Sequence, residues 1–185
     1  MMKRVLVITG VTGSGKTTVS KYLQSKYHLP KVITHTTRKP REGETNGVDY
    51  NFETRESMRK LDLLEQVTYD FNLYGSSMEG LNQAWEKDDL VTIVLDTKGA
   101  VTYKQKLGDQ AVIVFLTVSE PDSLKDRLAS RGDERIALVQ RIKSAEYHRD
   151  LKIPKQLDGH SHVIVNDDWN QTKIALGHIM DQLKA

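Results

Sequence analysis

The sequence predicts an α/β fold of three layers, in which a parallel core sheet lies between helices and carries a small mixed α+β subdomain and a lid. Three observations lead to this prediction. Short runs of β-branched residues alternate with segments of helical periodicity, the first run leads into a glycine-rich turn, and a middle stretch of different composition interrupts the alternation. Alternation of strands and helices favours parallel strands joined by right-handed crossovers.

Four short apolar runs are predicted to form the core strands, at residues 5–8, 90–95, 111–116 and 162–165. Because these runs are continuous rather than alternating, we expect their strands to be buried on both faces. Elsewhere apolar residues recur at helical spacing, which predicts helices at residues 16–27, 98–107, 120–130, 135–151 and 170–184. Ser119 is a suitable N-cap for the third of these helices.

The middle stretch, residues 34–85, is richer in Thr, Arg, Glu, Gly and Tyr, and its predicted strands are short, at residues 49–52, 66–69 and 73–74. We therefore expect one domain over residues 1–185, with residues 1–33 and 86–185 forming the core and 34–85 an inserted subdomain. Gly132 interrupts the helical pattern within a charged Arg-Gly-Asp-Glu-Arg run. A mobile lid is therefore predicted at about residues 127–141.

Composition excludes several classes of function. The 185 residues include 27 Lys and Arg against 25 Asp and Glu, a net charge of +2, so no global field favours nucleic acid or a membrane surface as a partner. The absence of cysteine excludes disulfides, thiolate metal sites and cysteine nucleophiles. No apolar run approaches the roughly 20 residues that span a bilayer. We expect a soluble cytoplasmic protein, and composition leaves its oligomeric state open.

A phosphate-binding motif follows the first predicted strand. Residues 10–17 match G-x-x-x-x-G-K-[ST], the P-loop of the P-loop NTPase fold, and a match by chance in a chain of this length is expected roughly once in a hundred. The glycines let successive backbone N–H groups point at phosphate oxygens. Lys16 is placed to reach the β- and γ-phosphates, and the Thr17 hydroxyl is placed to bind Mg²⁺. The predicted ATP-binding residues here are Gly10, Val11, Thr12, Gly13, Ser14, Gly15, Lys16, Thr17 and Thr18.

A second cluster of cations lies downstream. Arg38 and Arg41 flank Pro40, which stiffens the segment, and each guanidinium can grip a phosphate through paired hydrogen bonds. Hydroxyl groups of Thr34, Tyr50 and Tyr74 could complete an anion site. The alternative interpretation of an isolated Arg-Lys-Pro-Arg run is a solvated basic loop.

The run TTRKPREGETNGVDYNF, residues 36–52, closely resembles the GMP-binding segment of guanylate kinases. The resemblance continues over essentially the whole chain, through Glu65, the Tyr-Gly-Ser turn at residues 74–76, the Asp-Thr-Lys-Gly segment at 96–99, the Arg-Leu-Ala-Ser-Arg-Gly segment at 127–132, Arg141 and the Val-Asn-Asp-Asp segment at 165–168. It implies a P-loop nucleoside monophosphate kinase that transfers the γ-phosphoryl group of ATP to GMP or dGMP, with Mg²⁺ as cofactor and these nucleotides as its partners.

The resemblance also implies a role for each matching residue. The residues that it assigns to the GMP phosphate are Thr34, Arg38, Arg41, Tyr50 and Tyr74, and those that it assigns to the guanine edge are Glu65, Ser76 and Asp96. The residues that it assigns to ATP beyond the P-loop are Arg127, Arg131 and Asn166. Those expected to act in catalysis are Lys16, Arg38, Arg131 and Arg141. For Glu65 the chemistry agrees, because the ring N–H and 2-amino group of guanine suit a carboxylate, and such polar sites reject the wrong base by about 10⁴–10⁵-fold.

Three departures from the family pattern keep two alternatives open. Val94 stands where the family commonly has the first acid of D-x-D, the segment between Tyr50 and Glu65 is a few residues shorter, and the predicted lid is about one residue shorter and less acidic. One alternative is a guanylate kinase-like protein that binds nucleotide or a partner without catalysis. The other is a kinase of the same fold with another small phosphorylated acceptor. The complete P-loop favours an enzyme.

Overall fold

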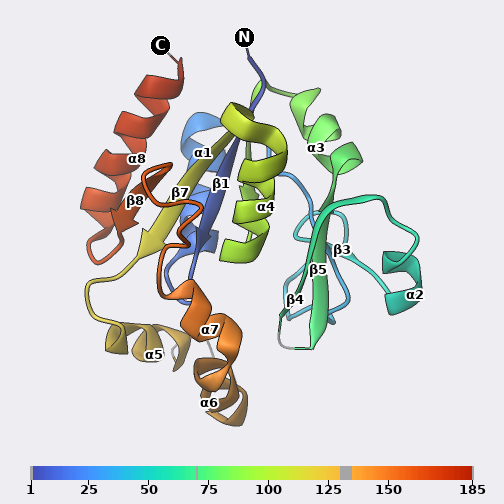
Figure 1. Ribbon diagram of the computed structural model, residues 1–185, viewed down its shortest axis with the longest axis vertical. Helices are drawn as coiled ribbons and strands as arrows, with labels where there is room; N and C mark the ends of the chain where they lie inside the picture. The colour runs from blue at the N-terminus through green and yellow to red at the C-terminus, as the bar shows by residue number, and fades with distance from the viewer. Residues whose placement is uncertain (1, 70, 130–134, 185) are drawn as a thin grey trace.

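The computed structural model describes residues 2–69, 71–129 and 135–184, with the side chains of residues 135–138 excepted. Its core is a four-stranded parallel sheet with the order β6 (Leu90–Val94), β1 (Arg4–Gly10), β7 (Ala111–Thr117) and β8 (Ser161–Val165). These strands match the four apolar runs. Strand β1 is an inner strand between β6 and β7, so the turn that follows it lies at the carboxyl ends of the parallel strands, away from the two edge strands (Figure 1).

Helices cover both faces of this sheet. Leu6 and Ile8 of β1 belong to the apolar cluster of α1 (Lys16–Tyr27) and α8 (Trp169–Lys184). Val5 and Val7 point the opposite way, into the cluster of α3 (Met78–Trp85) and α4 (Thr97–Leu107). Since side chains alternate along a strand, burial on both faces explains why β1 is continuously apolar. The predicted three layers are confirmed.

The middle stretch forms a second, mixed sheet with the order β3 (Asn51–Phe52), β2 (His35–Thr36), β5 (Asn72–Ser77) and β4 (Leu63–Tyr69). Strand β2 is parallel to β3 and antiparallel to β5, which pairs with β4 as a hairpin. The two-residue β2 and helix α3 were not predicted from sequence. A strand of two residues is too short to show periodicity, so only its pairing defines it.

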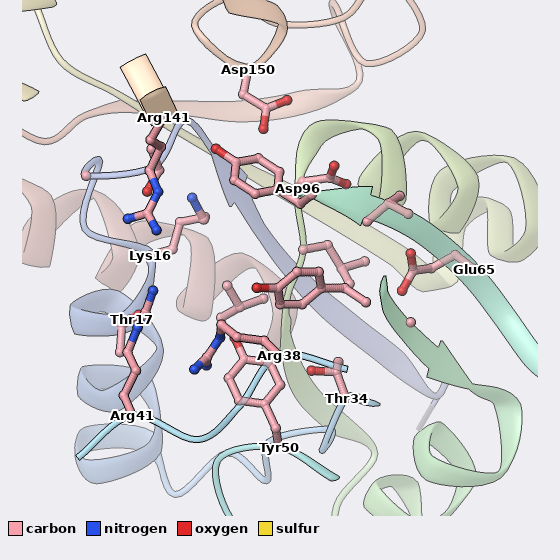
Figure 2. A pocket seen from close by; sticks show the side chains of 18 of the residues that line it. Lys16, Thr17, Thr34, Arg38, Arg41, Tyr50, Glu65, Asp96, Arg141 and Asp150 are labelled. Carbon is pink, nitrogen blue, oxygen red and sulfur yellow. The ribbon is translucent and has the colours of Figure 1, made fainter. Parts of the chain in front are cut away.

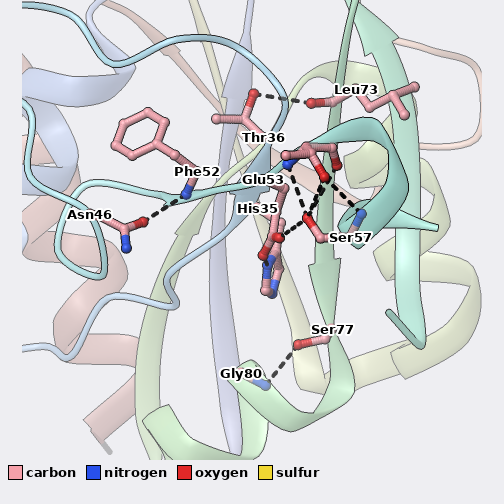
Figure 3. Close-up of polar contacts among 10 residues, drawn as sticks. His35, Thr36, Asn46, Phe52, Glu53, Ser57, Leu73, Ser77 and Gly80 are labelled. Atoms are coloured by element: carbon pink, nitrogen blue, oxygen red, sulfur yellow. Dashed lines mark hydrogen bonds and ion pairs between the residues drawn. The ribbon is translucent and has the colours of Figure 1, made fainter. Parts of the chain in front are cut away.

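Side-chain hydrogen bonds brace these short strands (Figure 3). The Thr36 hydroxyl donates to the Leu73 carbonyl over 3.0 Å, and the Phe52 N–H donates to Asn46 Oδ1 over 2.8 Å. Glu53 accepts from Ser57 and contacts His35 Nδ1 at 2.9 Å, beside the capping box that begins α2 (Arg55–Met58). These local bonds supplement strand pairings too short to be stable alone.

The predicted helix over residues 135–151 is wrong in one respect, because the structure has two helices there, α6 (Arg135–Lys143) and α7 (Ala145–Asp150). Ser144 separates them. Its backbone is extended, and its hydroxyl accepts from the Tyr147 N–H over 3.1 Å, the contact of an N-cap. The chain can therefore turn between the two helices.

Helix α5 (Asp122–Ala129) begins later than predicted, so Ser119 does not cap it; the Ser119 N–H instead donates to Asp167. Leu124 and Leu128 of α5 pack with Val11 and Tyr147 in a third apolar cluster. This cluster attaches α5 and α7 to the turn after β1. The 3₁₀ helix η1 (Gly108–Gln110) leads into β7. Of the helices in the described part of the chain, none has the length and apolar character needed to cross a membrane.

Candidate active site

One pocket of about 190 Å³ opens between the turn after β1, the second sheet and helix α7 (Figure 2). Most of the residues predicted to bind nucleotide line it: Thr12, Gly13, Gly15, Lys16, Thr17, Thr34, Arg38, Arg41, Tyr50, Glu65, Tyr74, Asp96 and Arg141. Lys16 and Arg141 lie on one side of it and Glu65 lies on the other (Figure 2). Segments far apart in sequence thus converge on one space.

The turn after β1 has the backbone that the phosphate-binding motif requires. Gly10, Gly13 and Gly15 have φ values of 130°, 88° and 99°, a region that residues with a side chain rarely adopt. A Cβ atom at Gly10 would lie 2.1 Å from the Leu116 carbonyl oxygen, so only glycine fits. The Lys16 ammonium group donates to the Gly10 and Val11 carbonyls over 2.7 and 2.9 Å. The Lys16 side chain therefore lies against the P-loop to which it belongs.

Asn166 braces the P-loop from behind. Its Nδ2 donates to the Ser14 carbonyl and its Oδ1 accepts from the Thr172 hydroxyl, both over 2.8 Å. A Cβ atom at Gly15 would lie 2.3 Å from Asn166 Nδ2, so the loop packs directly on this amide. Arg127 donates to the Asn166 carbonyl over 2.9 Å. The predicted contact of Asn166 with adenine stays a prediction, and the structure adds a bracing role.

Arg38 is held by Glu44, a residue to which the sequence analysis assigns no role. Its Nη1 and Nη2 atoms donate to the two carboxylate oxygens of Glu44, each over 2.9 Å, and its guanidinium lies 5.4 Å from the Tyr50 ring centroid. Glu44 also accepts from the Arg41 N–H over 2.7 Å. Burial opposes ionisation of Glu44, but the bonds from Arg38 and Arg41 outweigh it and lower the pKa of this carboxyl. The signal in the sequence was an acid placed three residues after Arg41.

Glu65 is a buried acid with one satisfied oxygen. Its side chain lies on β4 and the residue is 5% exposed. Oε1 accepts from the Ser76 hydroxyl over 2.9 Å, and Ser76 in turn accepts from the Tyr103 hydroxyl over 2.8 Å. Within the described residues Oε2 has no hydrogen-bond partner, although it is buried. Burial, opposed by Ser76 and assisted by the charge of Asp96, raises the pKa of Glu65 to about 7.

Asp96 stands beside Glu65 at the start of α4. Its Oδ1 caps the helix by accepting from the Gly99 N–H over 2.7 Å, and its Oδ2 accepts from Arg149 over 2.5 Å. Burial raises the pKa of Asp96, opposed by these two donors. Tyr69 and Asp150 line this end of the pocket and Arg149 contacts Asp96, and the sequence analysis assigned none of these polar residues to the site. Arg149 and Asp150 belong to α7, whose separate existence the sequence pattern did not reveal, whereas Tyr69 ends β4.

Some predicted residues lie outside the lining of the pocket. Ser76 is behind Glu65, and Arg127 and Asn166 are behind the P-loop. Four residues of the motif and its continuation are also not part of the pocket lining, namely Gly10, Val11, Ser14 and Thr18. Arg131, and with it the centre of the predicted lid, lies outside the described residues. Among the described residues no group of three or more His, Asp or Glu is arranged to hold a metal ion.

The chain resembles known proteins along nearly its whole length. A family model described as guanylate kinase matches residues 2–183. A guanylate kinase of Campylobacter jejuni is 35% identical over 183 residues, which cover 95% of this chain and 87% of that protein. One of Streptococcus pneumoniae is 35% identical over 170 residues, which cover 88% of this chain and 79% of that protein.

Solved structures agree on the fold. The crystal structure of guanylate kinase from Anaplasma phagocytophilum superposes with a TM-score of 0.68 at 22% identity, covering 98% of this chain and 85% of the other. A gluconokinase from Sinorhizobium meliloti has a TM-score of 0.53 at 14% identity, covering 99% and 97%. At such identities these likenesses concern the fold alone. The family follows from the sequence matches, which place this chain in the guanylate kinase family.

Proposed function

We propose that this protein is a guanylate kinase that transfers the γ-phosphoryl group of ATP to GMP, giving ADP and GDP. The observation that carries the proposal is one pocket with a P-loop lysine on one side and the half-satisfied carboxylate of Glu65 on the other. The first suits a triphosphate tail. The second suits a base with two adjacent donors, which guanine has and adenine lacks.

The donor nucleotide binds with its phosphates on the P-loop. The N-terminus of α1 presents backbone N–H groups and the positive end of its dipole there. Lys16 exchanges the carbonyls of Gly10 and Val11 for phosphate oxygens, a small movement for a side chain on a flexible stem. Arg141 faces the same space (Figure 2) and adds positive charge. Arg131 is proposed to act with it.

The acceptor binds between the arginines Arg38 and Arg41 and the acids Glu65 and Asp96. Glu44 holds the Nη edge of Arg38, so the guanidinium presents its Nε edge to the GMP phosphate together with Arg41 and Tyr50. The guanine N–H groups donate to Glu65 and Asp96. We assign residues 34–85 to this acceptor-binding part and residues 127–141 to the lid, as the family pattern implies.

The transfer needs alignment and charge neutralisation more than covalent help from the protein. A phosphate oxygen of GMP attacks the γ-phosphorus of ATP, a new oxygen–phosphorus bond forms, and the bond to the β-phosphate oxygen breaks with its electron pair leaving on ADP. The cations around the pocket offset the repulsion between the two anionic tails. Water is excluded as the lid closes, which suppresses ATP hydrolysis.

Magnesium is the proposed cofactor, and the residues present fit it. Mg²⁺ prefers oxygen ligands and usually keeps several waters while binding one or two side chains and the substrate phosphates. The Thr17 hydroxyl, exposed to the pocket at the start of α1, is the residue that would hold it. The lack of an acidic cluster among the described residues agrees with a metal carried mainly by ATP. When bound, it neutralises charge on the β- and γ-phosphate oxygens.

A coupled assay of ADP release tests the proposal. ATP is supplied with GMP, dGMP, AMP, UMP or CMP in turn, with and without Mg²⁺. Turnover with GMP and dGMP, and little with the other three, is the expected result. Equal turnover with AMP would contradict the guanine site, and preferred turnover with UMP or CMP would indicate a kinase with another acceptor. GMP binding without any turnover would indicate a binding module.

A further inference from the structure

Arg149 bridges the partly buried carboxylate of Asp96 and the buried carboxylate of Asp150 at the Glu65 end of the pocket. Its Nη2 donates to Asp96 Oδ2 over 2.5 Å and its Nε donates to Asp150 Oδ1 over 2.7 Å. Asp150 is 1% exposed and also accepts from the Thr97 hydroxyl. Asp96 and Thr97 begin α4, whereas Arg149 and Asp150 end α7. The four side chains therefore fasten α7 to the N-terminus of α4.

Asp96 is held from both sides by these contacts. The Gly99 N–H occupies Oδ1 and Arg149 occupies Oδ2, so the carboxylate has little freedom to turn. A point at the Cβ position of Gly99 lies 3.0 Å from Glu65 Oε2 and 3.2 Å from Asp96 Oδ1. The two acids thus approach the same small residue, and their spacing depends on how Asp96 is held.

We propose that Arg149 is a positioning residue for acceptor recognition, which keeps the Asp96 carboxylate in place beside Glu65 and so sets the preference for guanine over other bases. The inference rests on the proposed function, because it assumes that these acids face the acceptor base. Arg149 does not touch the substrate; it acts through Asp96. A planar guanidinium suits this task, since its fork reaches two carboxylates at once.

The positive charge of Arg149 also affects the ionisation of Asp96 beside Glu65. The charged groups around Asp96 are Glu65 from β4 and Arg149 and Asp150 from α7, while Lys106 of α4 acts on Glu65. Two neighbouring acids in a buried site compete to remain ionised. Without Arg149, Asp96 loses its cation and takes up a proton more readily. A protonated Asp96 is a poorer acceptor for the guanine amino group.

The test compares Arg149→Met and Arg149→Lys with the wild type, using Lys152→Met as a control that removes a nearby exposed cation. GMP, IMP and ATP affinities are measured by calorimetry, and kcat/KM for GMP is followed from pH 6 to 9. IMP lacks the 2-amino group. We expect Arg149→Met to weaken GMP binding at least about tenfold and to reduce the preference for GMP over IMP, with ATP affinity within about twofold. Lys152→Met should resemble the wild type.

The pH profile separates positioning from a merely structural role. In Arg149→Met the loss of activity with GMP should shrink as the pH rises, because Asp96 regains its charge. Arg149→Lys should have the pH profile of the wild type, with an intermediate affinity for GMP, because an ammonium group supplies the charge but not the fork. Equal loss of GMP and ATP binding at every pH would overturn the proposal.

A double-mutant cycle with Asp96→Asn completes the test. If Arg149 acts through Asp96, Arg149→Met should weaken GMP binding less than about twofold further in the Asp96→Asn background. Independent, additive losses contradict the proposal. Should Arg149→Met unfold, Arg149→Lys carries the test, and unchanged GMP and IMP affinities in that folded variant contradict it. A wild type that binds GMP without turnover would refute the proposed function and leave the inference testable by binding.

Discussion

Ser76 donates its hydroxyl to one oxygen of the Glu65 carboxylate over 2.9 Å, while the other oxygen is buried without a hydrogen-bond partner among the described residues, in a residue that lines the pocket. Tyr103 holds Ser76 in turn, over 2.8 Å. Leaving a buried oxygen unsatisfied costs free energy unless a ligand supplies donors. The arrangement is therefore prepared for a ligand that brings N–H groups.

Glu65 should make the protein less stable as the pH rises. Its pKa is raised from 4.5 to about 7, so between these values the folded state binds more protons than the unfolded state, and the free energy of unfolding falls with increasing pH. Glu65→Gln lacks this contribution. Between pH 5 and pH 8 the free energy of unfolding of the wild type should therefore fall by up to about 3 kcal/mol more than that of the variant. Urea unfolding of both proteins at pH 5 and pH 8 measures this difference. An equal change in the free energy of unfolding in the two proteins would contradict the prediction.

Glu65→Gln should also reduce the discrimination between GMP and AMP. A glutamine amide has one oxygen acceptor where the carboxylate has two, so guanine loses a charge-assisted hydrogen bond. The amide NH₂ group can also donate to adenine, which the carboxylate cannot do. We expect kcat/KM for GMP to fall at least about 100-fold, with the KM for ATP changed less than about threefold. Steady-state assays with both acceptors decide this. An unchanged ratio of GMP to AMP would remove Glu65 from base recognition.

Lys16→Ala should abolish transfer while GMP still binds. The ammonium group lies on the P-loop, away from the acids at the other side of the pocket (Figure 2). A loss of at least about 100-fold in kcat is expected, because the variant lacks a cation at the transferring group. Rapid-quench turnover and calorimetry with GMP give the two readouts. Lys21→Ala, which removes an exposed lysine of the same helix, is the control, and wild-type kcat in Lys16→Ala would exclude the assigned role.

Glu44→Gln should weaken the binding of the acceptor phosphate. The carboxylate orients Arg38 through two bonds of 2.9 Å, and an amide can accept only one of them. We expect the KM for GMP to rise about tenfold while the KM for ATP stays within about twofold. Glu42→Gln changes an exposed acid two residues away and serves as the matched control. Similar kinetics for the two variants would show that Glu44 does not position Arg38.

Gly15→Ala should destabilise the fold through the contact with Asn166. Both Gly15 and Gly43 have positive φ, but a Cβ atom at Gly43 meets nothing within 4 Å whereas one at Gly15 lies 2.3 Å from Asn166 Nδ2. Gly43→Ala therefore reports the backbone strain alone, about 1–2 kcal/mol, and Gly15→Ala adds the displacement of a buried amide from Ser14. A clearly lower midpoint of thermal unfolding is expected for Gly15→Ala. Equal midpoints would mean that Asn166 yields without cost.

The sequence alone determined the features that depend on neighbours along the chain. The P-loop needs its glycines and lysine at fixed spacing within eight residues, and the core strands need continuous apolar runs. Arg38 and Arg41 could be recognised for the same reason, because the two charges and the proline lie in one short segment.

Only the tertiary structure decided the partners of these residues. Asp96 and Arg149 lie 53 positions apart, and nothing in the local pattern around either residue indicates the other. Their contact requires the break at Ser144 that creates α7 and the docking of this helix beside α4. Long-range hydrogen bonds between side chains depend on how whole elements pack, which periodicity and spacing do not specify.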